Sequence, residues 1–115
     1  MARKKKPSRK YTPRDEIRYN NSKKAAGHPH YVFGEKDSFY YSLGFTTHPK
    51  KGFPTYELQD IPNPNCRRKN YVQRKVFKQN KRVYGKIISG WNFSSDDMSI
   101  LRRIIKNYKR SLKRK

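Results

Sequence analysis

Apolar and polar residues alternate along the middle of the chain, which is the pattern of β-strands. The clearest example is 39–46, where every second residue is apolar and one face of the strand would be buried. Turn-forming residues such as Gly34 and the run 62–65 separate the alternating stretches. The pattern predicts about five strands, at 30–33, 39–46, 55–61, 70–78 and 83–89.

The end of the chain has the three- and four-residue spacing of an amphipathic helix. Ser94 can cap the first turn, and Asp97 stands three residues later, as in a capping box. An apolar stripe then consists of Met98, Leu101, Ile104, Ile105, Tyr108 and Leu112. Because the basic residues fall mostly outside this stripe, we expect the helix to pack through its apolar side and to expose its charges.

At the beginning of the chain, residues 1–10 form a basic arm without hydrophobic periodicity, which we expect to be disordered until it meets phosphates. Thr12 and Pro13 have the character of a helix start, since Thr can cap and Pro suits the first helical position. These signals predict a short helix at 13–20. The expected organisation is a largely disordered basic arm at 1–27 and a single small domain at 28–115.

The length of 115 residues allows one domain, or one domain with tails. The expected fold class is α+β: a small antiparallel sheet or partly closed barrel of about five strands, followed by a C-terminal amphipathic helix. An apolar content of 32% combined with 33% charged residues is typical of disordered chains. Aromatic residues nevertheless make up 14% of the chain, which favours a folded unit with solvated basic extensions.

Positive charge is concentrated in three parts of the chain. Lys and Arg number 30 against 8 Asp and Glu, for a net charge of +22. Residues 28–65 are close to neutral, whereas 1–27, 66–93 and 94–115 are strongly basic. A compact chain with this charge repels itself unless an anion neutralises it. Nucleic acid is the abundant intracellular polymer that meets this need, and we expect its binding to weaken steeply with salt.

The charge has two other interpretations. A lysine-rich surface can simply keep a protein in solution, but such surfaces normally mix both signs. An anionic membrane would require a basic amphipathic helix whose apolar face has no protein core to pack against. The longest strictly apolar run is the triplet 39–41, far short of a membrane span. The expected partner is therefore nucleic acid, within a nucleoprotein complex or alone, and no membrane.

Basic and aromatic residues interleave at 67–78. On a strand, Tyr71, Lys75 and Phe77 would face one way and Arg74 the other. Exposed aromatics can stack unpaired bases, which favours RNA or single strands over duplex DNA, although the same aromatics can instead belong to the core. The candidate nucleic-acid-binding residues are spread over the arm, the strands and the helix: Arg3, Lys4, Lys5, Lys6, Arg9, Lys10, Arg67, Arg68, Lys69, Tyr71, Arg74, Lys75, Lys78, Lys81, Arg82, Lys86, Arg102, Arg103, Lys106, Lys109 and Arg110.

The three histidines raise the alternative of an enzyme. His28, His30 and His48 could supply the general acid and base of a small, metal-independent, toxin-like endoribonuclease, with Arg or Lys stabilising the phosphate. The competing interpretation is that the stretch 27–30 merely begins a strand. Asp96 and Asp97 are explained by helix capping.

The lone Cys66 excludes an internal disulfide and a cysteine-cluster metal site, and it favours a reduced, cytoplasmic protein. Carboxylates are few, and none has ligand spacing with the histidines, so we expect no metal and no cofactor. We also find no phosphate-cradling glycine-rich loop and no nucleophile elbow.

Several short motifs carry a resemblance to a known group of proteins. They are the stretches 27–34 and 43–46, the Asn63-Pro64-Asn65 turn, and the run 90–94 with Asp97. Over roughly residues 27–108 the chain resembles small, very basic proteins of phages and mobile elements of Gram-positive bacteria. The resemblance implies an intracellular bacterial or phage setting, in which the protein could act on a host nucleoprotein by binding its nucleic acid. It assigns no catalytic residue.

Overall fold

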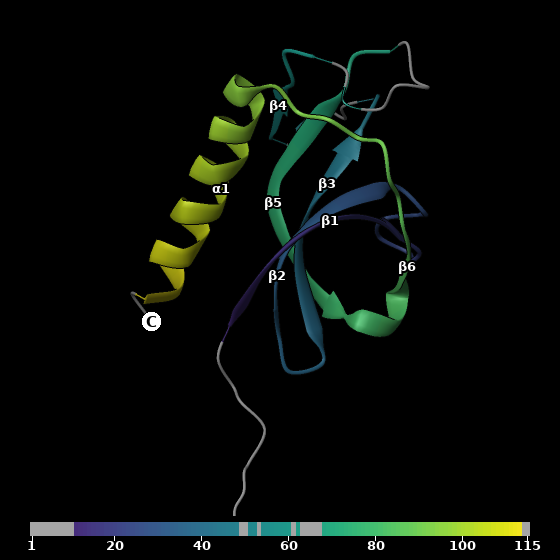
Figure 1. Cartoon of the computed structure of the whole chain (residues 1–115), viewed down its shortest axis with the longest axis vertical. Helices are drawn as coiled ribbons and strands as arrows, with labels where there is room; N and C mark the ends of the chain where they lie inside the picture. Colours follow the sequence, from purple (N-terminus) through teal and green to yellow (C-terminus); the bar gives the residue numbers. More distant parts are fainter. Residues whose placement is uncertain (1–10, 49–50, 53, 61, 63–67, 114–115) are drawn as a thin grey trace, which may run out of the picture.

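In the part of the chain that the structure describes, six antiparallel strands form one open sheet, and one α-helix follows it along the chain (Figure 1). The structure is a computed structural model that describes residues 11–48, 51–52, 54–60, 62 and 68–113. The order of the strands in the sheet is β4-β5-β3-β2-β1-β6. Their bounds are β1 Thr12–Asn20, β2 Pro29–Lys36, β3 Phe39–Thr46, β4 Thr55–Glu57, β5 Tyr71–Asn80 and β6 Tyr84–Ile87, with a short 3-10 helix η2 at Lys81–Val83 and the helix α1 at Ser95–Lys113. The α+β class is confirmed, with six strands in place of about five.

The short helix expected at 13–20 is wrong, because these residues form β1. The strand pairs with β2, placing Ile17 opposite Tyr31, and Ile17 is buried in the core. Pro13 lies where the register shifts, a position that tolerates the missing N–H of proline. Tertiary pairing has therefore overridden the local capping signals, and β1 belongs to the domain that we expected to begin at residue 28.

The sheet is strongly curled, and a simple length argument shows why. β5 and β6 are separated in the sheet by three other strands, so in a flat sheet they would lie about 19 Å apart. The chain crosses from Asn80 at the end of β5 to Tyr84 at the start of β6, and four residues span at most about 14 Å. The sheet must bend to bring β5 and β6 together. It stays open, because β4 and β6 are its edge strands and each pairs with one neighbour in the sheet.

Curling buries both faces of the central strands. On β3, Tyr41, Leu43 and Phe45 pack into the main core between the sheet and α1, as the alternation predicts. The opposite face was expected to be the more polar one, yet Tyr40 and Ser42 on it are buried too. Tyr40 packs with residues of β2 and β6 in a second, smaller core inside the curl. The fold thus has a helix-covered face and a concave face.

The helix α1 begins as its sequence predicts. The Ser94 hydroxyl accepts a hydrogen bond from the backbone N–H of Asp97 at 3.1 Å, which is an N-cap contact. Leu101 is fully buried and Met98, Ile104, Ile105 and Tyr108 pack against the same core. Leu112, the last member of the expected stripe, is 43% exposed and lies outside it.

The side chain of Asp97 links the start of α1 to the chain that follows β4. Its carboxylate is fully buried and accepts hydrogen bonds from the backbone N–H groups of Gln59 at 2.7 Å and Asp60 at 3.1 Å. This contact explains why β4 ends at Glu57 instead of continuing to residue 61. The chain leaves the sheet after β4 and its backbone donors turn to the helix N-terminus.

Candidate functional site

The concave side of the sheet carries a cavity of about 590 Å³ on which all three histidines converge. His28 precedes β2, His30 lies on β2 and His48 follows β3, and register places His30 opposite Gly44 of β3. Lys75, Gln73 and Phe77 of β5 complete one wall, and Lys24 lies at the loop before β2. The cavity therefore collects residues that are widely separated along the chain.

His30 is the buried centre of this cavity, with 1% of its surface exposed. Its Nδ1 lies 2.9 Å from the Ser42 hydroxyl and 3.5 Å from the Asn20 amide nitrogen. Burial, with a smaller contribution from His28, lowers the His30 pKa to about 3. His30 is consequently neutral near pH 7 and cannot act as a general acid there.

The hydrogen bonds of Asn20 decide which nitrogen of His30 carries the proton. The Asn20 Oδ1 accepts from the backbone N–H of Ser22 at 3.0 Å, and this fixes the orientation of the amide. Its NH₂ group donates to Gln79 Oε1 at 2.6 Å and presents its other hydrogen to His30 Nδ1. Nδ1 therefore acts as an acceptor, which leaves the proton of the neutral ring on Nε2.

The buried side chain of Tyr84 contacts both Ser42 and the His30 ring. The hydroxyls of Ser42 and Tyr84 lie 2.6 Å apart, and the Tyr84 ring stands edge-on to His30 with centroids 6.2 Å apart. Burial raises the pKa of Tyr84 to about 12, so the phenol stays protonated at neutral pH. The imidazole is held by groups from β1, β3 and β6, and its Nε2 edge is left toward the cavity.

The other two histidines lie at the surface of the cavity. The ring of His28 donates from Nδ1 to the backbone carbonyl of Phe45 at 3.2 Å, which leaves Nε2 unprotonated in the neutral ring. His48 accepts from the Arg68 guanidinium through Nε2 at 2.8 Å, and its Nδ1 lies 3.0 Å from the Thr47 hydroxyl. Of the two, His28 keeps the nitrogen better suited to accept a proton.

β5 divides the basic residues between the two faces of the sheet. Lys75 lies on the cavity side, whereas Arg74 lines a smaller cavity of about 280 Å³ that it shares with Ile104 and Tyr108 of α1. Lys78 lies on the same side as Arg74, 5.1 Å from the centre of the Phe39 ring. This division confirms the alternation expected for the interleaved stretch.

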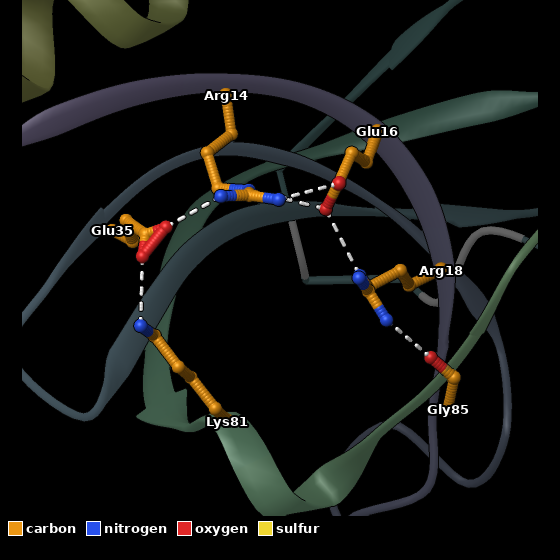
Figure 2. Close-up of polar contacts among 6 residues, drawn as sticks. All are labelled: Arg14, Glu16, Arg18, Glu35, Lys81 and Gly85. Atoms are coloured by element: carbon orange, nitrogen blue, oxygen red, sulfur yellow. Dashed lines mark hydrogen bonds and ion pairs between the residues drawn. The ribbon is translucent and has the colours of Figure 1, made fainter.

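Two acidic residues, Glu16 and Glu35, form ion pairs that hold strands of the sheet together (Figure 2). Glu16 binds Arg14 at 2.7 Å and Arg18 at 3.0 Å, and Glu35 bridges Arg14 at 2.6 Å and Lys81 at 2.7 Å. These hydrogen bonds hold the pKa of both carboxyl groups below its ordinary value. Lys81 is thereby committed to the fold, although we expected it to bind nucleic acid.

The remaining cations are not neutralised in this way. Among the residues that the structure describes, no ion pair involves the exposed side chains of Arg74, Lys75, Lys78, Arg82, Lys86, Arg102, Arg103, Lys106, Lys109 or Arg110. Lys69 pairs with Glu57 at 3.3 Å, with both groups exposed. Tyr71 is half-buried where β5 pairs with β4. Seven expected binding residues lie outside the described part of the chain: Arg3, Lys4, Lys5, Lys6, Arg9, Lys10 and Arg67.

Several members of the cavity escaped sequence reasoning. Lys24 and Gln73 line the cavity but carry no motif, and Ser42, which contacts His30 from outside the lining, carries none either. Only the assembled fold brings these residues near the histidines. Within the described residues, no group of three or more His, Cys, Asp or Glu side chains is arranged to hold a metal ion. In the same part of the chain, no helix has the length and apolar character needed to cross a membrane.

Comparison of the chain with protein-family models, curated proteins and solved structures found no match. The resemblance to basic proteins of phages and mobile elements therefore stays a prediction.

Proposed function

We propose that the protein binds nucleic acid and contacts its phosphates mainly through β5 and α1. The observation that carries this proposal is that acidic side chains are already paired within the fold. Glu16 and Glu35 form ion pairs with Arg14, Arg18 and Lys81. The basic residues of α1 have no such partners among the described side chains. A folded surface with this charge is the electrostatic footprint of a polyanion-binding protein.

The helix presents its charges in a regular array. Arg103, Lys106 and Arg110 recur at three- and four-residue spacing on the exposed side of α1, so they lie along one line of the helix surface. Arg74 and Lys78 lie on the face of the sheet that α1 covers, and the cavity at Arg74 borders α1 directly. A row of cations beside a strand suits contact with successive phosphates.

The test is binding of fluorescein-labelled single-stranded RNA, single-stranded DNA and duplex DNA, measured by anisotropy from about 50 to about 300 mM salt. We expect a log–log slope of about −0.7 to −0.9 for each phosphate contacted. Replacing Arg103 and Lys106 together by Gln should flatten the slope by about 1.4 to 1.8. The matched control replaces Lys36 and Lys51, which are exposed elsewhere, and should leave the slope nearly unchanged. Binding that does not respond to salt would overturn the proposal.

The convergence of three histidines on one cavity favours a second candidate, a metal-independent endoribonuclease. His30 stays neutral, so proton transfer would fall to His28 and His48. Incubation of RNA with the protein in EDTA decides the matter. Cleavage that disappears in His28→Ala, and that spares a DNA-substituted control lacking the 2′-hydroxyl nucleophile, would support the enzyme. Intact RNA after incubation with the unaltered protein removes it.

A further inference from the structure

We infer that the histidine cavity binds one unpaired nucleobase of a single strand, an inference that rests on the proposed nucleic-acid binding. The first support is the unused polar edge of His30. Its Nδ1 is engaged by Ser42 and Asn20, and its Nε2–H has no hydrogen-bond partner among the described residues. A donor on a side chain that is 99% buried is costly to leave unpaired unless a ligand or water meets it.

The second support is the space left over Gly44. A Cβ atom at this position would lie 2.9 Å from His30 Nε2 and 2.6 Å from Gln73 Oε1. The Nε2 edge of His30 and the amide of Gln73 therefore both lie next to Gly44, which has no side chain to fill the space between them. A donor beside a group that can both donate and accept is the kind of edge that reads the rim of a base by hydrogen bonds.

The third support comes from the walls and rim of the cavity. Phe77 stands edge-on to His30, with ring centroids 4.8 Å apart, and small or apolar side chains such as Ala25 and Pro54 line the same space. Exposed Lys24 and Lys75 lie at its border. Apolar walls, a polar edge and peripheral cations match the three parts of a nucleotide: a flat ring, its hydrogen-bonding rim and its phosphate.

The size and setting of the cavity decide between paired and unpaired bases. A volume of about 590 Å³ falls within the usual range for small-molecule sites. The hydrogen-bonding groups lie inside the curl, on a residue that is almost fully buried. A base held in a duplex cannot reach such a group, whereas a splayed base of a single strand can enter.

The decisive probe is a pair of labelled single strands with equal length and equal charge, one intact and one with abasic sites throughout. If the cavity takes a base, the unaltered protein should bind the intact strand roughly 5- to 100-fold more tightly, which is the usual effect of base stacking. Equal affinity for the two strands would overturn the inference. Salt-sensitive binding of both strands would at the same time leave the proposed function standing, and absence of salt-sensitive binding to either would remove both.

Two variants test the cavity itself. Gln73→Ala removes the amide, and Gly44→Ala places a methyl group between Gln73 and His30. Gln73→Ala should weaken binding of the intact strand roughly 2- to 10-fold, the usual effect of one lost hydrogen bond. Gly44→Ala, which obstructs the base, should weaken it roughly 5- to 100-fold, and both should leave the abasic strand unaffected. Gln59→Ala and Gly85→Ala are matched controls outside the cavity. Gln73→Ala only deletes atoms, so it keeps the test decisive if Gly44→Ala fails to fold. Equal weakening of both strands in Gln73→Ala would contradict the inference.

Free nucleotides distinguish the source of the base. Nucleoside monophosphates are titrated while the His30 imidazole is followed by ¹H–¹⁵N NMR. Weak binding that shifts the His30 Nε2 resonance, together with tighter binding of the strand, supports a site for a base within a strand. Binding of a free nucleotide as tight as that of the strand would overturn the inference in favour of a mononucleotide site.

Discussion

Burial of a neutral histidine makes the stability of the fold depend on pH in a defined window. The pKa of His30 is lowered to about 3 in the folded chain, against an ordinary value of 6.5. Between these values the unfolded chain binds one more proton than the folded chain, so the free energy of unfolding falls as the pH falls. Integrating from pH 6.5 to pH 5 gives a loss of about 1.6 kcal/mol from this residue alone.

Between pH 6.5 and pH 5, the titration of His30 affects stability while that of Glu16 and Glu35 does not. Glu16 and Glu35 have lowered pKa values, so their stabilisation is lost only below their unfolded pKa near 4.5. Urea unfolding at pH 6.5 and pH 5, followed by circular dichroism, measures the difference in free energy. His30→Asn should be less stable at both pH values and should lose the pH dependence that His30 contributes. The control His48→Asn, at an exposed site, should keep it.

Two results would refute this reasoning. One is a free energy of unfolding for the unaltered protein that does not change between pH 6.5 and pH 5. The other is an equal change in His30→Asn and in the unaltered protein. Either would mean that folding does not lower the pKa of His30, and the claim that the ring stays neutral inside the fold would fail with it.

Three further substitutions test the packing and the buried polar contacts by urea unfolding, each with a control. Leu101→Ala should cost about 2–5 kcal/mol because Leu101 is fully buried, whereas Leu112→Ala, at a 43% exposed site, should cost less than about 1 kcal/mol. Asp97→Ala should cost about 2–3 kcal/mol by leaving the N–H groups of Gln59 and Asp60 unpaired, and exposed Asp96→Ala should cost little. Glu35→Gln should cost about 1–3 kcal/mol near pH 7, since it removes the carboxylate that binds both Arg14 and Lys81 and leaves these two cations close together beside the Tyr40 ring. Glu57→Gln, which breaks an exposed pair with Lys69, should cost about 0–1 kcal/mol, and a larger effect there than at Glu35 would contradict the account.

The helix and the central strands could be predicted because their signals are local. Ser94 and the spacing of Leu101, Ile104 and Tyr108 specify a capped amphipathic helix without reference to the rest of the chain, and the structure begins α1 at Ser95. The alternation at 39–46 likewise matches β3 to the residue. In both elements the periodicity that predicts the structure is the one that buries the core.

β1 could not be predicted in the same way, because its alternation is carried by charge. Arg14, Glu16 and Arg18 occupy every second position, and their partners Glu35 and Lys81 come from β2 and η2. The charged face of β1 becomes favourable only when the sheet has formed and brings these partners next to it. The local signals at Thr12 and Pro13 indicated a helix, and pairing with β2 prevailed.

The candidate site shows the same limit. The three histidines could be singled out by residue type, but their convergence depends on the register that sets His30 opposite Gly44. Neither Asn20 nor Ser42 has a sequence signal for its contact with His30. These contacts hold the ring inside the fold, where burial keeps it neutral, and the role that we propose for it is therefore recognition instead of proton transfer.

Phosphate binding and base binding both involve β5. Substitutions of the adjacent residues Arg74 and Lys75 can test the two proposals separately. β4 pairs with β5 only from Tyr71 to Gln73, so in the described structure the edge of β5 beyond Arg74 has no neighbouring strand. A single strand crossing this edge can place phosphates near Arg74 and α1 while one base enters the cavity beside Lys75.

Arg74→Gln should therefore weaken intact, abasic and duplex probes alike, because it removes a phosphate contact on the helix side. Lys75→Gln removes the same charge one residue away but on the cavity side. It should weaken the intact single strand more than the duplex, by about 2- to 10-fold, because only the single strand brings a nucleotide to that rim. Anisotropy with the same three probes measures both variants. If both variants weaken the three probes to the same extent, the two faces of β5 do not act separately. The positive charge of β5 alone would then account for binding.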